Sequence, residues 1–119
     1  MAAVVCWCVL GVIHALPALA LFHPGLVSSL YGVEAGSDTH LLLRHRAALF
    51  LIICVACAWA ALRPETRQLA TVSVSISMLS FLLLYWLAGA PPALRGIAIG
   101  DLVGLPFLAF AGWRAFRAA

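Results

Sequence analysis

LLLRHRAALFLIICVACAWAAL, residues Leu41 to Leu62, is the stretch that decides the fold class. It is apolar throughout, except for Arg44, His45 and Arg46 close to its start. About 20 apolar residues form an α-helix long enough to cross the ~30 Å hydrocarbon core of a bilayer. The apolar residues are continuous rather than alternating, and lipid cannot hydrogen-bond to exposed backbone, so a helix is favoured over a strand. The stretch therefore predicts a transmembrane helix with three ionisable side chains near one end.

Three further apolar runs of similar length flank this one, at residues 3–22, 68–88 and 93–116. Proline-containing segments separate all four runs, because proline cannot continue a helix. The 119 residues are 66% hydrophobic and 9% charged, whereas soluble domains are roughly 45–50% apolar and about 25% charged. A chain of this length cannot bury this much apolar surface in its own interior. We therefore expect one domain, residues 1–119, with much of its surface in lipid.

The first connection contains a short amphipathic segment. Residues 26–31 place apolar side chains on one helical face, and Gly32 follows as a stop signal. Ser37 or Asp38 then fits the N-cap of the next helix. The predicted fold class is therefore all-α, an integral membrane four-helix bundle with a short interfacial helix in the first loop.

The distribution of arginines predicts an orientation. The first run is interpreted as a membrane helix rather than a cleaved signal peptide, since no basic residue precedes it and His14 interrupts it. Four crossings place both ends of the chain on one side, which collects four arginines against three on the other. The positive-inside rule then favours a multi-pass membrane protein with cytoplasmic termini.

Polar side chains inside the four runs fall in one layer, at the end away from the termini. A helix rises 1.5 Å per residue, which places them all within about 12 Å of the same membrane face. These candidate ligand-binding or proton-relay residues are His14, Arg44, His45, Arg46, Tyr85 and Asp101.

Asp101 is the most informative of these residues. A carboxylate inside an apolar helix costs several kcal/mol unless it is protonated or paired. Arg44 or Arg46 is the expected partner, and because these two diverge by roughly 200° around their helix, only one of them is expected to face the bundle.

Two prolines mark the same layer. Pro17 removes the backbone amide that would bond to the carbonyl of Ile13, beside His14. Pro106 removes the amide that would bond to the carbonyl of Leu102, beside Asp101. Irregular backbone at membrane depth is tolerated where it lines a cavity or contacts protein. The pattern therefore predicts a pocket, although interface anchoring and simple helix stapling remain alternatives.

Small residues predict helix packing. Glycines at four-residue spacing let two helices approach closely in lipid, and serines on one helical face bond across helices or to their own backbone. The partner is either within this chain or in a second subunit. The residues concerned are Gly96, Gly100, Gly104, Ser73, Ser77 and Ser80.

The cysteines and histidines raise the question of a metal or haem. Cys6, Cys8, Cys54 and Cys57 lie at similar depth, but they have no fifth donor, so we interpret them as small buried hydrophobes and predict no metal site. No cofactor is predicted. Haem held between two helices requires two well-placed histidines. The first two runs supply His14 and His45, so a haem-binding protein remains an alternative.

Several motifs together resemble those of a group of small bacterial inner-membrane proteins. They are Ile13-His14-Ala15-Leu16-Pro17, Leu30-Tyr31-Gly32-Val33, Leu42-Leu43-Arg44-His45-Arg46-Ala47, Ser77 with Phe81, and Arg95 with Asp101. The resemblance covers most of the chain, implies the same four-helix fold and highlights the same polar residues, but it implies no activity. Chains of this kind are sometimes labelled phosphopantetheine adenylyltransferases, an assignment we reject, since neither its nucleotide-binding histidine motif nor its α/β sheet is present. The cysteine pairs depart from the group.

These observations leave three classes of function. The first is a His/Arg/Asp cluster that binds an amphipathic or lipid-like ligand or relays protons. The second is a non-catalytic accessory or assembly subunit of a larger membrane complex, and the third is a small membrane enzyme or a haem or quinone electron-transfer protein. Expected partners are membrane lipid and either a second copy or another membrane subunit. The sparse arginines form no dense basic face, which argues against nucleic-acid binding.

Overall fold

The structure, a computed structural model, describes residues 1–118. These residues form five α-helices and two short 3₁₀ helices and contain no strand. The elements are α1 (Ala2–Leu19), α2 (Pro24–Tyr31), α3 (Asp38–Leu62), η1 (Pro64–Thr66), α4 (Arg67–Leu87), η2 (Pro92–Leu94) and α5 (Arg95–Arg117). Four helical segments, Ala2–Leu19, Asp38–Leu62, Pro64–Leu87 and Pro92–Arg117, are long and apolar enough to cross a membrane.

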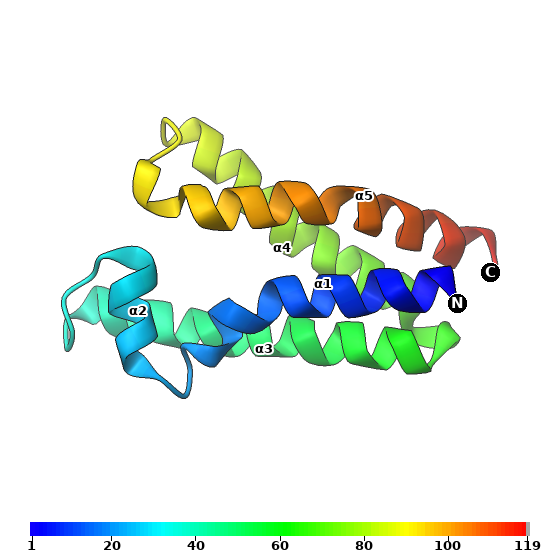
Figure 1. The fold of residues 1–119 in the computed structure, drawn as a ribbon, viewed down its shortest axis with the longest axis horizontal. Coiled ribbons are helices and arrows are strands. Elements are labelled where there is room, and N and C mark those ends of the chain that lie inside the picture. Colours follow the sequence, from blue (N-terminus) through cyan, green and yellow to red (C-terminus); the bar gives the residue numbers. More distant parts are fainter. Residues whose placement is uncertain (119) are drawn as a thin grey trace.

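The four long helices form a bundle with extents of 46 × 30 × 18 Å. α1 packs against α3 and α5, and α4 packs against α5 and, less extensively, against α3. Both ends of the chain lie at the same end of the bundle as the α3–α4 connection, whereas α2 and the α4–α5 connection lie at the opposite end (Figure 1). We call these the terminal end and the α2 end.

Local sequence signals account for the helix limits at the α2 end. α1 ends at Leu19, earlier than the expected Phe22, because the following residues form turns before Pro24 begins α2. Gly32 ends α2 with a φ of 65°, the left-handed conformation that glycine adopts most readily. Ser37 caps α3, since its hydroxyl accepts a hydrogen bond from the backbone amide of His40.

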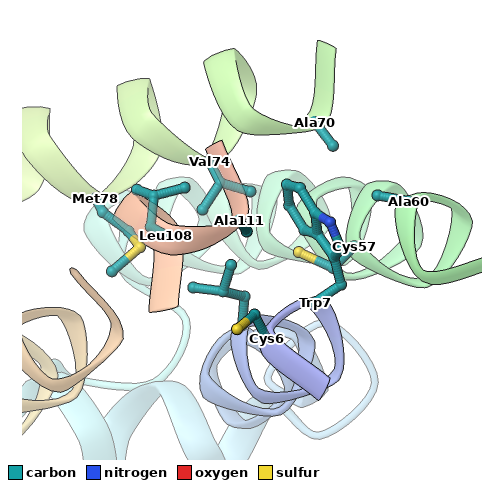
Figure 2. Close-up of a cluster of buried hydrophobic side chains, with 10 residues drawn as sticks. Cys6, Trp7, Cys57, Ala60, Ala70, Val74, Met78, Leu108 and Ala111 are labelled. Atoms are coloured by element: carbon teal, nitrogen blue, oxygen red, sulfur yellow. The ribbon is translucent and has the colours of Figure 1, made fainter. Parts of the chain in front are cut away.

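The largest buried cluster lies toward the terminal end. Trp7 of α1, Cys57 of α3, Val74 of α4 and Ala111 of α5 come together there, so all four long helices contribute (Figure 2). At the α2 end the buried clusters are smaller, and each contains only three buried residues. The packing of all four long helices is therefore most extensive in the terminal half.

Candidate functional site

A cavity of about 470 Å³ opens among α1, α2, α3 and α5 at the α2 end. Most of its lining is apolar, and two ionisable residues from different helices interrupt it. This combination of a mostly apolar wall with a few polar groups is typical of small-molecule sites, which span roughly 300–1,000 Å³. Its lining includes Ile13, His14, Pro17, Leu30, Phe50, Ile97 and Asp101.

His14 is held in one orientation within this cavity. Its side chain is 2% exposed, and its Nδ1 lies 2.8 Å from the carbonyl oxygen of Leu10. A carbonyl can only accept, so Nδ1 carries the proton and donates, and in the neutral ring Nε2 is left as an acceptor. Within residues 1–118, this buried Nε2 has no hydrogen-bond partner. A buried polar atom without a partner costs about 1–3 kcal/mol, so a ligand that donates to it would recover that loss.

Asp101 reaches the same cavity from α5. Its side chain is 8% exposed, so it is buried as the sequence led us to expect. Across the described chain, however, no arginine nitrogen lies within 4.0 Å of its carboxylate, so the direct ion pair that we expected is not formed. Asp101 and His14 instead line the same cavity, each from a different helix.

The side chain of Arg44 bonds to the backbone between α1 and α2 and does not line the cavity of His14 and Asp101. It is exposed, and its Nε donates to the carbonyl oxygen of Leu21 at 3.1 Å. This bond ties the connection between α1 and α2 to α3. His45 is also exposed, whereas His14 is buried, so the two histidines considered for haem lie in different surroundings. The haem alternative remains a prediction.

Arg46 faces the bundle but does not reach Asp101. Its guanidinium carbon lies 5.0 Å from the ring centroid of Phe50 and 5.4 Å from that of Phe81, both of which are cation–π distances. Arg46 also lines a second cavity of about 430 Å³, together with Tyr85. Phe50 belongs to the walls of both cavities, so the predicted polar layer is divided in two at this ring.

Sequence reasoning missed the aromatic residues around Arg46. Phe50 follows Arg46 by four residues, and side chains at this spacing meet on a helix, so the sequence did carry a signal for this contact. Phe81 comes from α4, and only the tertiary packing brings it to Arg46. Ser29 and Leu30 of α2 also join the wall of the first cavity, which the sequence did not predict.

The glycines of α5 differ in their surroundings. A Cβ on Gly104 would lie 2.7 Å from Cε of Met78, so this position packs inside the chain. A Cβ on Gly100 would lie 3.9 Å from Cγ2 of Ile13, and one on Gly96 would meet nothing within 4 Å. The glycine spacing therefore serves internal packing at Gly104 and leaves Gly96 open.

The serines of α4 lie on the cavity side of the helix or at its edge. Ser77 and Ser80 both line the second cavity, and the hydroxyl of Ser80 donates to the carbonyl oxygen of Ser77 at 3.3 Å. Ser73 is half-buried. Part of the predicted serine face thus belongs to the wall of a cavity.

The cysteines are free thiols in differing surroundings. Cys6 and Cys57 are buried and Cys8 is exposed, while the half-buried thiol of Cys54 donates to the carbonyl oxygen of Gly11 at 3.5 Å. Residues 1–118 contain no group of three or more histidine, cysteine or acidic side chains arranged to hold a metal ion.

Comparison with protein families, with curated proteins and with solved structures finds no match to this chain.

Proposed function

We propose that this chain is a multi-pass protein of the bacterial inner membrane, with four crossings and cytoplasmic termini. Four long apolar helices support the proposal, and so do the large apolar side chains on their outer faces, such as Leu62, Leu69 and Leu87, which are 73–79% exposed. Water would oppose such exposure, whereas lipid does not. In this arrangement the amphipathic α2 lies in the interface at the outer face.

Within that membrane domain, the cavity that contains His14 and Asp101 binds an amphipathic, lipid-like ligand. One observation carries this proposal: the buried Nε2 of His14 has no partner and belongs to a residue that shares a cavity wall with Asp101. A ligand with a hydroxyl or amine head group would donate to Nε2 and bond to the carboxyl group. The apolar lining from Pro17, Leu30 and Ile97 suits the first part of a hydrocarbon tail.

A proton relay is the variant of this function that uses the same two side chains. Histidine titrates near neutrality, and carboxyl groups are the other common members of intramembrane proton relays. Binding is favoured because the cavity is lined mainly by apolar side chains, which fit a hydrocarbon ligand better than a file of water molecules.

Mass spectrometry of the protein purified without delipidation tests the binding function. His14→Leu removes the acceptor, and Asp101→Asn keeps the shape of the side chain while removing its charge. Each variant should retain about a tenth, or less, of the amount of the molecule that accompanies the wild-type chain, since each loses a buried polar contact. His45→Leu and Glu65→Gln alter an exposed histidine and an exposed acid, and they should retain the wild-type amount.

Identical sets of retained molecules in all folded variants would refute ligand binding at this cavity. The same proteins, reconstituted in vesicles that contain a pH-sensitive dye, test the relay. Proton flux that His14→Leu and Asp101→Asn abolish, in the absence of any retained molecule, would favour the relay over ligand binding.

A role as an accessory or assembly subunit is the second candidate. The observation that favours it is Gly96, which is exposed and has no atom of another element within 4 Å of its Cβ position. An open glycine on a membrane helix allows a helix of another subunit to approach closely. Gly96→Leu should then abolish recovery of a partner while leaving the fold intact, and equal recovery would exclude this surface. Gly96 also lines the cavity of His14 and Asp101, so recovery of the partner, not of the cavity ligand, is the readout for this variant.

A further inference from the structure

We propose that Arg46 forms a binding site for an oxyanion, a phosphate or carboxylate group, in the second cavity between α3 and α4. This site is separate from the cavity of His14 and Asp101, although Phe50 belongs to the wall of both. Its occupant is the anionic head group of a membrane amphiphile or a free oxyanion, and the two share the chemistry that Arg46 recognises.

Arg46 forms no direct ion pair with an acidic side chain of residues 1–118, although Asp101 is near enough to interact with its charge. Its guanidinium lies over the rings of Phe50 and Phe81, and no carboxylate of residues 1–118 is within 4.0 Å of it. Ring faces stabilise the positive charge, but they offer no oxygen atom to the five N–H donors of the guanidinium. A half-buried arginine at membrane depth is costly unless an anion or a polar group completes its shell.

Hydroxyl groups of α4 line the space beside Arg46. Ser77, Ser80 and Tyr85 of α4 all line the cavity with Arg46. Tyr85 is 9% exposed and is stacked on Phe81 at 6.0 Å between ring centroids, so its position is fixed by packing. The hydroxyl of Ser80 already donates to the carbonyl oxygen of Ser77, so the hydroxyls of Ser77 and Tyr85 are the ones left to join the guanidinium at an oxyanion.

The site lies in the first half of α3, toward the α2 end of the bundle. Arg46 lies roughly 12 Å along α3 from Asp38, the first residue of the helix, at 1.5 Å per residue. Long basic side chains at this depth extend toward the head-group layer. The cavity, at about 430 Å³, holds a phosphate group and the first part of an attached chain.

The test uses thermal unfolding of the full chain in dodecyl maltoside, a detergent without phosphate or charge. Sodium phosphate is titrated at constant ionic strength, and in separate samples phosphatidylglycerol or phosphatidylcholine is added to the micelles. We expect the unfolding midpoint of the wild-type chain to rise with phosphate, with phosphatidylglycerol or with both, and to rise less with the zwitterionic phosphatidylcholine. Arg46→Gln should weaken the apparent affinity by about tenfold, because a charge-assisted bidentate contact is lost.

Arg95→Gln is the matched control, since Arg95 is an exposed arginine at the same end of the bundle and does not line the cavity. It should respond like the wild-type chain. A response to phosphate identifies a free-oxyanion site, and a response to phosphatidylglycerol alone identifies a lipid head group. The absence of any response, or an equal response in Arg46→Gln, overturns the proposal.

Two milder variants keep the test decisive if Arg46→Gln does not fold. Arg46→Lys keeps the charge but loses the planar fork, and Tyr85→Phe removes only one hydroxyl group. Both should weaken the anion response in a folded protein, and wild-type responses in both would overturn the proposal. His14→Leu should leave this response unchanged, so failure of this site and failure of the first cavity are distinguishable.

Discussion

Gly112 of α5 and Thr71 of α4 are in such close contact that a Cβ on the glycine would lie 2.8 Å from Cγ2 of the threonine. Thr71 cannot turn away freely, because it is β-branched and its hydroxyl donates to the carbonyl oxygen of Arg67 at 2.7 Å. The distance between the two helices therefore depends on the missing side chain of Gly112.

Gly112→Ala should lower the free energy of unfolding by about 1–3 kcal/mol, the usual cost of overpacking. Gly104→Ala should cost less, because its nearest contact is Cε of Met78, the end of a flexible side chain that can shift. Unfolding by dodecyl sulfate titration in mild detergent, followed by circular dichroism, measures both changes.

Two controls isolate the contact between Gly112 and Thr71. Gly96→Ala adds its Cβ to open space and should leave the stability unchanged or slightly raised. Adding Thr71→Ser to Gly112→Ala removes the clashing methyl group, keeps the hydroxyl and should restore most of the loss. Equal losses for Gly96→Ala and Gly112→Ala would contradict the packing argument.

Ser37→Ala should destabilise the first turn of α3 by about 1 kcal/mol, since it removes the only side-chain cap of that helix. The same turn holds His40, whose Nε2 hydrogen-bonds with the carbonyl oxygen of Pro24 at 3.1 Å, so the loss should also loosen α2. Hydrogen exchange at the amides of residues 38–41 and of α2 should become faster. Ser37→Asp retains an acceptor for the amide of His40 but loses the bond that the Ser37 hydroxyl donates to the carbonyl oxygen of Glu34, so its exchange should fall between that of the wild-type chain and that of Ser37→Ala. Unchanged exchange in Ser37→Ala would contradict the role of the cap.

Tyr31 should make the docking of α2 sensitive to alkaline pH. Burial raises the pKa of its phenol above the ordinary value of about 10, and the nearby Arg46 guanidinium acts in the opposite direction with a smaller effect. Because the folded-state pKa is raised, the stabilising contribution is complete below pH 10 and is lost as the pH rises through the folded-state pKa. Thermal unfolding at pH 7 and pH 11 should show a larger decrease in midpoint for the wild-type chain than for Tyr31→Phe, and equal decreases would count against this role.

Most of the fold follows from signals that are local in sequence. The four apolar runs predicted the four long helices, and the apolar face of residues 26–31 with Gly32 after it predicted a short helix in the first connection. Helix ends differ from the expected ones by a few residues because capping and turns, rather than hydropathy, fix them, as the early end of α1 at Leu19 illustrates.

The candidate site was harder to predict, because it depends on which side chains meet across helices. Depth along a helix placed His14 and Asp101 in one layer, and they do line one cavity. Depth does not determine direction, however, and Arg44 bonds to the backbone at Leu21 while Arg46 lies between aromatic rings. The ion pair was therefore inferred from the cost of a buried charge alone, without the packing that decides where each guanidinium goes.

The proposed orientation in the membrane predicts opposite accessibility for two exposed acids. Glu34 lies in the α2–α3 connection at the α2 end, and Glu65 lies in η1 at the terminal end (Figure 1). Because the arginine bias favours cytoplasmic termini, Glu34→Cys should react with a membrane-impermeant maleimide in intact spheroplasts, and Glu65→Cys should react only after lysis. The unmodified chain gives the background from its own thiols, of which Cys8 is exposed. Reversed labelling would show the opposite orientation, and equal labelling of the two positions before lysis would contradict four crossings.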